Sequence, residues 1–261
     1  MRGLKLDRPP RWGVVALALA LVANGGLFAF FVIRPAPRDA YDPAASTAAL
    51  PSAAAPSSST TSPPATQATS AAPVLAVYGD GYAAGNELGG LGSAGWPALV
   101  AQRTGATLSL HAVSQAGYAA QGVTGQDFPA LVKASPERNA AVTVLFGSRN
   151  DEGDDPAVVQ ACAAQTISTL KANAPGMVVI VIGPVWSDAA APAPLRAIRD
   201  AVQDAAGAAG VQFVDPLALG WFARPSGLIA ADGVSPTDAG NAYLASQIAP
   251  FVTAALAAGH P

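Results

Sequence analysis

The chain has 261 residues, of which 51% are hydrophobic and 12% are charged, and its formal net charge is −3. Because no stripe of Lys and Arg follows the extreme N-terminus, the charge pattern excludes an electrostatic surface for nucleic acid. With one cysteine, Cys162, and two histidines, His111 and His260, we expect no intrachain disulfide, no metal site and no cofactor.

An apolar segment, Trp12–Ile33, follows a basic N-terminus and is long enough to cross a bilayer as a helix. The basic residues before it are Arg2, Lys5, Arg8 and Arg11. Their charge places residues 1–11 in the cytoplasm and everything after the segment outside. The alternative is a cleaved signal peptide and a secreted protein, but signal peptides have shorter apolar regions, of about 7–15 residues. We therefore favour a single-pass membrane anchor.

Residues 34–72 are mostly Pro, Ala, Ser and Thr, with almost no large apolar residue after Tyr41. Such a composition cannot bury enough apolar surface to offset the loss of backbone entropy on folding. Its prolines favour a semi-extended spacer. The sequence therefore predicts a disordered linker, followed by one folded domain over residues 73–261.

Within this domain, short apolar runs alternate with helical patterns. The predicted strands are Val74–Tyr78, Thr107–Val113, Ala141–Phe146, Met177–Ile182 and Val211–Val214. The predicted helices are Trp96–Arg103, Phe128–Ala134, Ala157–Ala174, Leu195–Ala209 and Thr237–Ala258. Near-continuous apolar strands separated by helices indicate a parallel sheet covered on both faces. We expect an α/β fold with five strands in the flavodoxin-like doubly wound order, which binds ligands at the carboxyl ends of its strands.

Four polar segments lie where predicted strands end or where the last helix begins. They are Gly79-Asp80-Gly81-Tyr82, Ser114-Gln115-Ala116-Gly117-Tyr118, Gly147-Ser148-Arg149-Asn150-Asp151, and the segment from Asp232 to Gly240. Their order and spacing resemble blocks I, II, III and V of the SGNH (GDSL-type) hydrolases, and together they extend across the whole domain. The resemblance implies the SGNH hydrolase fold and a site built for ester hydrolysis.

In that family a block I serine attacks the ester carbonyl, and a block V histidine, oriented by an aspartate, takes its proton. The resemblance assigns Asp232 to the orienting acid, Gly81 to the nucleophile position and Ser235 to the base position. Gly81 has no side chain, and a serine hydroxyl is not a base near neutral pH. Both proton-moving groups are therefore substituted.

The resemblance also implies hydrogen-bond donors for an oxyanion. These are the backbone N–H groups of Gly81 and Gly117 and the side-chain amide of Asn150, with Asp80 and Asp151 as neighbours. Such donors bind a carbonyl, carboxylate or sugar oxygen without breaking a bond. The sequence thus predicts a polar pocket that has kept its binding groups.

Two of these positions also have local structural explanations. Ser235 has the pattern of an N-cap, with Pro236 as the first residue of the last helix and Asp238 completing a capping box. Gly81 is suited to a tight turn with positive φ at the exit of the first strand. Both interpretations are expectations about backbone geometry.

Three functional hypotheses follow from these observations. The first is a non-catalytic protein of the cell envelope that binds a glycan, an acyl group or another protein. The second is an active serine esterase or acylhydrolase, acting on O-acyl esters of cell-wall sugars or lipids, with Ser114 or Ser148 as the nucleophile. The third is a structural or interaction domain with a vestigial pocket.

Overall fold

The computed structural model describes residues 71–188, 190–224 and 226–259. The predicted cytoplasmic residues 1–11, the predicted anchor Trp12–Ile33 and nearly all of the predicted linker lie outside these ranges. Within the described ranges, no helix has both the length and the apolar composition that a membrane span requires.

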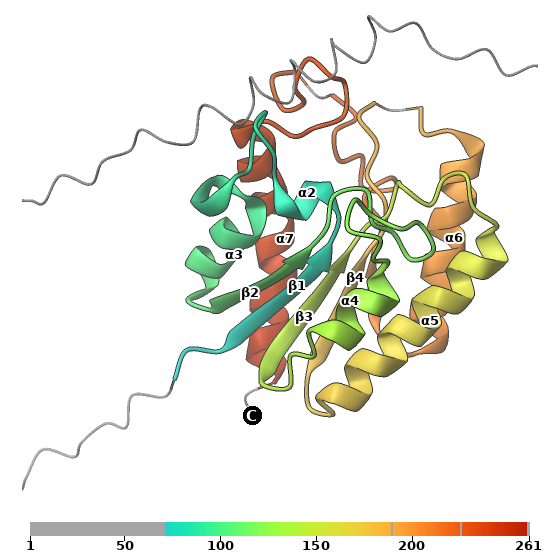
Figure 1. Cartoon of the computed structure of the whole chain (residues 1–261). Coiled ribbons are helices and arrows are strands. Elements are labelled where there is room, and N and C mark those ends of the chain that lie inside the picture. Colours follow the sequence, from blue (N-terminus) through green and yellow to red (C-terminus); the bar gives the residue numbers. More distant parts are fainter. Residues whose placement is uncertain (1–70, 189, 225, 260–261) are drawn as a thin grey trace, which may run out of the picture. The chain divides into compact units, whose positions relative to one another are not determined.

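Five parallel strands form one sheet, in the order β2-β1-β3-β4-β5 (Figure 1). Their bounds are β1 Val74–Gly79, β2 Thr107–Ala112, β3 Ala140–Phe146, β4 Val178–Ile182 and β5 Gln212–Val214. The predicted fold class and flavodoxin-like strand order are confirmed. Because all five strands run the same way, their carboxyl ends lie at one edge of the sheet.

Helices cover both faces of the sheet (Figure 1). Their bounds are α2 Gly81–Ala84, the 3-10 turn η1 Gly92–Ala94, α3 Trp96–Thr104, α4 Phe128–Ala134, α5 Pro156–Asn173, α6 Ala193–Ala208 and α7 Asp238–Ala258. One face packs against α3 and α7, and the other packs against α4, α5 and α6. The predicted helices are confirmed. The structure adds α2 and η1, which are too short to show a helical period of apolar residues in the sequence.

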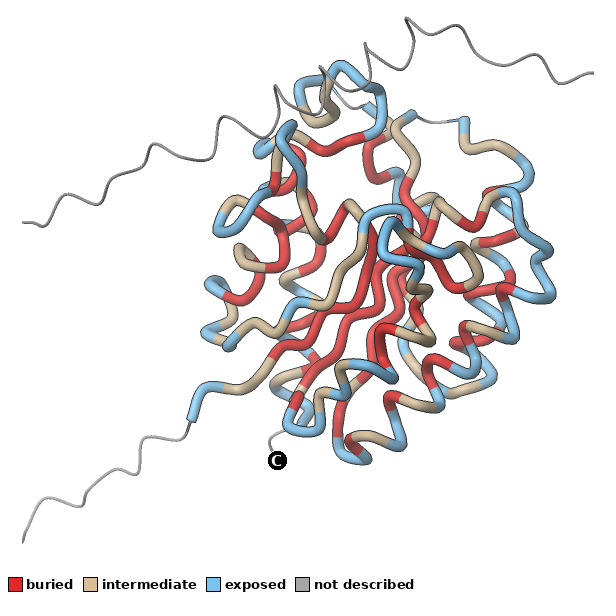
Figure 2. Tube along the Cα trace, in the orientation of Figure 1, coloured by how far each residue is buried: buried red, intermediate tan, exposed pale blue. Residues whose placement is uncertain are grey.

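Alternate residues of each inner strand enter different hydrophobic cores. Val144 belongs to the core under α3 and α7, and its neighbour Leu145 belongs to the core under α4, α5 and α6. Both side chains are fully buried, and Figure 2 shows the inner strands as a buried layer between the helices. Burying one such side chain contributes roughly 1.5–3 kcal/mol, so the continuous apolar runs hold the carboxyl edge of the sheet in place.

The expected positive φ at Gly81 is wrong. Gly81 is the first residue of α2 and is absent from the glycines with positive φ. Asp80 caps this short helix, because its Oδ1 accepts the Tyr82 N–H at 2.9 Å. The chain therefore leaves β1 through a helix N-terminus, a conformation open to other residues at position 81.

The expected N-cap at Ser235 is also wrong. The helix α7 begins at Asp238, and its N-cap is Thr237, whose side chain accepts the Gly240 N–H at 3.1 Å. Pro236 instead forms an antiparallel bridge with Ile229. Ser235 therefore lies before the N-cap residue, and its hydroxyl does not cap the helix.

Candidate functional site

A cavity of about 280 Å³ lies at the carboxyl edge of the sheet, where the chain leaves β1, β2 and β3. Its lining residues are Asp80, Gly81, Tyr82, Asn86, Ser114, Gln115, Arg149, Asn150, Val234, Ser235 and Pro236. The predicted nucleophile and base positions, Gly81 and Ser235, thus face one cavity from segments about 150 residues apart in the sequence. We call this cavity the Gly81 pocket.

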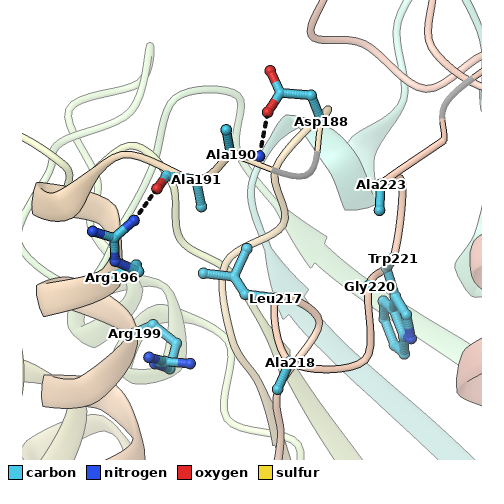
Figure 3. A pocket seen from close by; sticks show the side chains of 10 residues that line it. All are labelled: Asp188, Ala190, Ala191, Arg196, Arg199, Leu217, Ala218, Gly220, Trp221 and Ala223. Carbon is cyan, nitrogen blue, oxygen red and sulfur yellow. Dashed lines mark hydrogen bonds between the residues drawn. The ribbon is translucent and has the colours of Figure 1, made fainter.

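A second and larger cavity, of about 400 Å³, lies between the loop after β4 and the loop after β5 (Figure 3). Its walls include Leu217, Trp221 and the α6 residues Arg196 and Arg199. None of the predicted site residues lines it. We therefore place the candidate functional site in the smaller Gly81 pocket.

Gly81 leaves room for a side chain that it does not have. A Cβ built on its backbone would lie 3.4 Å from Ser114 Oγ, and the next atoms that it would meet, Cα and Cβ of Ser114, are 3.9 and 4.0 Å away. These are ordinary van der Waals contacts. The Gly81 N–H, at the first position of α2, has no hydrogen-bond partner among the described residues. The position therefore offers a backbone donor to the pocket and lacks only the nucleophile.

Asp232 holds the residue at the base position, as the family resemblance implies. Its Oδ2 accepts the Ser235 hydroxyl at 2.6 Å, and its Oδ1 accepts the backbone N–H groups of Val234 and Ser235 at 2.9 Å each. These bonds, that from the Ser235 hydroxyl first, lower the pKa of Asp232 below its ordinary value. Ser235 Oγ also accepts from Asn86 Nδ2 at 2.9 Å. The hydroxyl is thus fixed on both sides.

Gly117 does not reach the pocket. Its N–H donates to the carbonyl of Ala120 at 2.8 Å, and it is absent from the cavity lining. The prediction that it donates to an oxyanion is therefore wrong for this structure. Position 117 requires glycine for a steric reason, because a Cβ there would lie 2.3 Å from Asp151 Oδ1. Only glycine permits this close approach.

Asn150 lines the pocket, but both hydrogens of its side-chain amide have partners. Nδ2 donates to Asp80 Oδ2 at 3.0 Å and to the Ala116 carbonyl at 2.8 Å. Donation to a ligand oxygen would require one of these bonds to break. Of the three predicted oxyanion donors, the Gly81 N–H alone is unengaged and in the pocket.

Asp80 and Asp151, predicted only as neighbours, organise the backbone around the pocket. Burial raises the pKa of Asp80 to about 7, opposed by the hydrogen bond from the Tyr82 N–H and by the charge of Arg149. Asp80 therefore holds its proton to a much higher pH than an exposed aspartate does.

Asp151 is fully buried and accepts three backbone N–H groups. They belong to Tyr118 at 2.8 Å, Ala119 at 2.9 Å and Ala120 at 2.8 Å. These bonds fold the loop after β2, which carries Ser114 and Gln115 to the pocket wall. Asp151 acts on the site through this loop.

Arg149 is a pocket residue that sequence reasoning missed. Its guanidinium carbon lies 4.5 Å from the centre of the Trp186 ring, and it forms no ion pair with a carboxylate in the described part of the chain. Its Nη1 is enclosed and has no hydrogen-bond partner there. In the sequence Arg149 occupies a position between motif residues to which the family resemblance assigns no role. Its contact with Trp186 joins two loops that are far apart in the sequence, so no local pattern predicts it.

The two serines considered as alternative nucleophiles differ in access. Ser114 is exposed and lines the Gly81 pocket. Ser148 is fully buried, and its Oγ accepts the Asn150 N–H at 3.1 Å. No histidine is among the pocket residues; His111 lies in β2, with its Nε2 2.8 Å from Glu137 Oε1. Only Ser114 remains a candidate by position.

Comparisons with known proteins agree with this fold. The GDSL-like Lipase/Acylhydrolase family matches residues 77–243. A GDSL lipase of Mycobacterium tuberculosis is 40% identical over 187 residues, which are 69% of this chain and 81% of the lipase.

Solved structures are similar at lower identity. TesA has a TM-score of 0.58 at 24% identity, with 70% of this chain and 99% of that chain covered. A carbohydrate esterase family 2 enzyme of Corynascus thermopiles has a TM-score of 0.59 at 19% identity, with 72% of this chain and 68% of that chain covered. At these identities the likeness shows the fold alone, and it is the fold that the motifs predicted.

Proposed function

The chain belongs to the GDSL-like lipase/acylhydrolase family, and on this premise we propose that it is a non-catalytic member that binds a ligand in the Gly81 pocket. The observation that carries the proposal is the pairing of Gly81 with the fixed hydroxyl of Ser235. One position supplies no attacking atom. The other is a serine hydroxyl that donates a hydrogen bond to the Asp232 carboxylate, and a hydroxyl is not a base that can take a proton from a nucleophile near neutral pH.

The loss at both positions is severe because triad members act as a unit. Removing them leaves roughly 10³–10⁴-fold acceleration over water, from binding and oxyanion stabilisation alone. Of the three predicted oxyanion donors, the Gly81 N–H is the one that lines the pocket and has no partner among the described residues. Polar binding without turnover is the function that these groups support.

The proposal extends to location and ligand. We place the domain outside the membrane on a retained anchor, Trp12–Ile33, with a cleaved signal peptide and secretion as the alternative; the apolar length and the preceding basic residues support the anchor. A ligand of the cell envelope, a glycan, an acyl group or a protein, follows from that location. The similarity to a lipase supports a ligand related to an acyl ester.

The test restores the missing pair in the full chain, purified in mild detergent. Gly81→Ser places a hydroxyl where a Cβ has room, and Ser235→His places an imidazole beside Asp232. We expect the double variant to hydrolyse a short-chain aryl ester and to react with a fluorophosphonate probe. We expect neither activity from the two single variants or from the unmodified chain.

Adding Asp232→Asn to the double variant is the matched control, and it should reduce the gained activity because the imidazole loses its orienting carboxylate. Covalent labelling of the unmodified chain, or its turnover of the ester, would overturn the non-catalytic assignment. A folded double variant without activity would show that these positions do not form the reactive centre.

One observation favours an active hydrolase as the second candidate. Ser114 presents an exposed hydroxyl 3.4 Å from the Cβ position of residue 81, in a pocket that also holds Asp80 with its pKa of about 7. A carboxylate of that pKa is a competent general base. Fluorophosphonate labelling of the unmodified chain that disappears in Ser114→Ala would establish this alternative.

A further inference from the structure

Arg149 has the features of a ligand-binding cation. It lines the Gly81 pocket, and its guanidinium carbon lies over the Trp186 ring, 4.5 Å from the ring centre. A cation–π contact of this kind leaves guanidinium N–H groups free to donate to other acceptors. Two adjacent donors, Arg149 Nη1 and Trp186 Nε1, are enclosed without a hydrogen-bond partner in the described chain. Enclosed donors of this kind are normally satisfied by an acceptor.

The arginines of the second cavity differ. Arg199 pairs with Asp200 and Asp215, with N–O distances of 2.6 Å each. Arg196 donates to the carbonyl of Ala191 (Figure 3). Both guanidinium groups therefore have acceptors within the protein. Arg149 differs because it has no carboxylate within ion-pair distance among the described residues, and its Nη1 has no acceptor there, although its charge acts on Asp80 and it hydrogen-bonds to the Tyr82 side chain.

We propose that the ligand of the Gly81 pocket carries a carboxylate, and that the Arg149 guanidinium binds it. The inference rests on the proposed binding function of this pocket and names its ligand class. A guanidinium donates two parallel N–H bonds to a carboxylate, a geometry that also selects a planar anion. Besides Asp80, the polar side chains that line the pocket are amides and hydroxyls, among them those of Asn86, Gln115 and Ser114. The class that fits both sets is a hydroxylated carboxylate, such as an acidic sugar.

The charge of the pocket favours a single negative charge over two. Asp80 lies in the same cavity, and near neutral pH it is partly ionised. A phosphate dianion would be repelled by this carboxylate more strongly than a carboxylate ligand would be. We therefore expect glucuronate to bind more tightly than inorganic phosphate.

The experiment measures binding to the full chain in mild detergent by calorimetric titration and by ligand-observed NMR. The probes are glucuronate, glucose as the same ring without the carboxylate, and inorganic phosphate. Glucuronate should bind at least about tenfold more tightly than glucose. Arg149→Gln should weaken glucuronate binding about ten- to hundredfold and leave glucose binding unchanged. Arg149→Lys should fall between the two, because it keeps the charge and loses the fork.

Arg196→Gln, on the wall of the second cavity, is the matched control and should bind glucuronate as the unmodified chain does. Several results would overturn the inference: no preference for glucuronate over glucose, a preference that survives in both Arg149 variants, or one that is lost in the control. Phosphate binding equal to glucuronate binding would replace the carboxylate with a general anion. Should Arg149→Gln fail to fold, Arg149→Lys still decides the matter. Ester turnover by the unmodified chain would contradict the non-catalytic function and leave this test valid.

Discussion

Replacing Asp151 with asparagine tests how the pocket wall is held. The carboxylate is fully buried and accepts the N–H groups of Tyr118, Ala119 and Ala120. In Asp151→Asn, the remaining oxygen can keep the bonds from Ala119 and Ala120, both of which go to Oδ1. The new NH₂ group then faces the Tyr118 N–H, a donor against a donor.

The expected cost follows from these three bonds. A hydrogen bond to a charged group contributes about 1.5–3 kcal/mol, and a buried donor without an acceptor costs about 1–3 kcal/mol. One bond is lost in Asp151→Asn and two lose their charge, so we expect the free energy of unfolding to fall by roughly 3 kcal/mol. With a slope of about 1–3 kcal/mol per molar urea, the unfolding midpoint should fall by about 1–3 M.

The measurement is a urea titration followed by far-ultraviolet circular dichroism and tryptophan fluorescence. Asp155→Asn is the matched control, because Asp155 is exposed and makes one capping bond, to the Ala157 N–H at 2.9 Å. Asparagine caps a helix about as well as aspartate, so this variant should differ by less than about 0.5 kcal/mol. Equal midpoints for the two variants would refute the assignment of Asp151 as the residue that holds the loop.

Three further predictions concern stability. The folded-state pKa of Asp80 is raised from 3.8 to about 7, so the unfolded chain loses this proton first, and the contribution of Asp80 to stability declines between pH 4 and pH 7. Urea midpoints of the unmodified chain should therefore fall more steeply over that range than those of Asp80→Asn; parallel curves would contradict the raised pKa. Gly81→Ala should stay within about 1 kcal/mol of the unmodified chain in thermal unfolding, whereas Gly117→Ala should lose more than about 2 kcal/mol because its Cβ would lie 2.3 Å from the Asp151 carboxylate. Ile180→Ala, at a fully buried residue of β4, should cost about 2–5 kcal/mol by urea unfolding, and a smaller loss would mean that the core relaxes around the cavity.

Most of the fold follows from local pattern. Strands such as Val142–Phe146 in β3 are buried on both faces, so they carry a continuous apolar run that can be recognised without knowledge of their neighbours. The short helix α2 carries no such signal, because its four residues depend on the Asp80 cap and on packing of Tyr82 and Ala83. An element held mainly by tertiary contacts leaves little trace in the sequence.

The site was predictable where position along a strand decides the outcome. Gly81, Asn150 and Ser235 lie in one pocket, as their places at strand and helix ends imply. The direction of an N–H group or a hydroxyl depends on partners far away in the sequence. The hydroxyl of Ser235 is fixed by Asn86, and the N–H of Gly117 turns to its own loop. The predicted N-cap at Ser235 and the predicted oxyanion donor at Gly117 were wrong for that reason. Arg149 was missed because its position depends on a contact with Trp186, which is distant in the sequence.

The packing of Gly117 against Asp151 has a consequence for how this sequence can vary. The carboxylate occupies the volume that any side chain at position 117 would need, and its acceptors are matched to the loop that begins there. A change at either position alone meets a steric clash or loses backbone hydrogen bonds. Their effects are therefore coupled and non-additive, so libraries of single substitutions should yield few stable variants at either position, whereas libraries that vary both codons together can yield more.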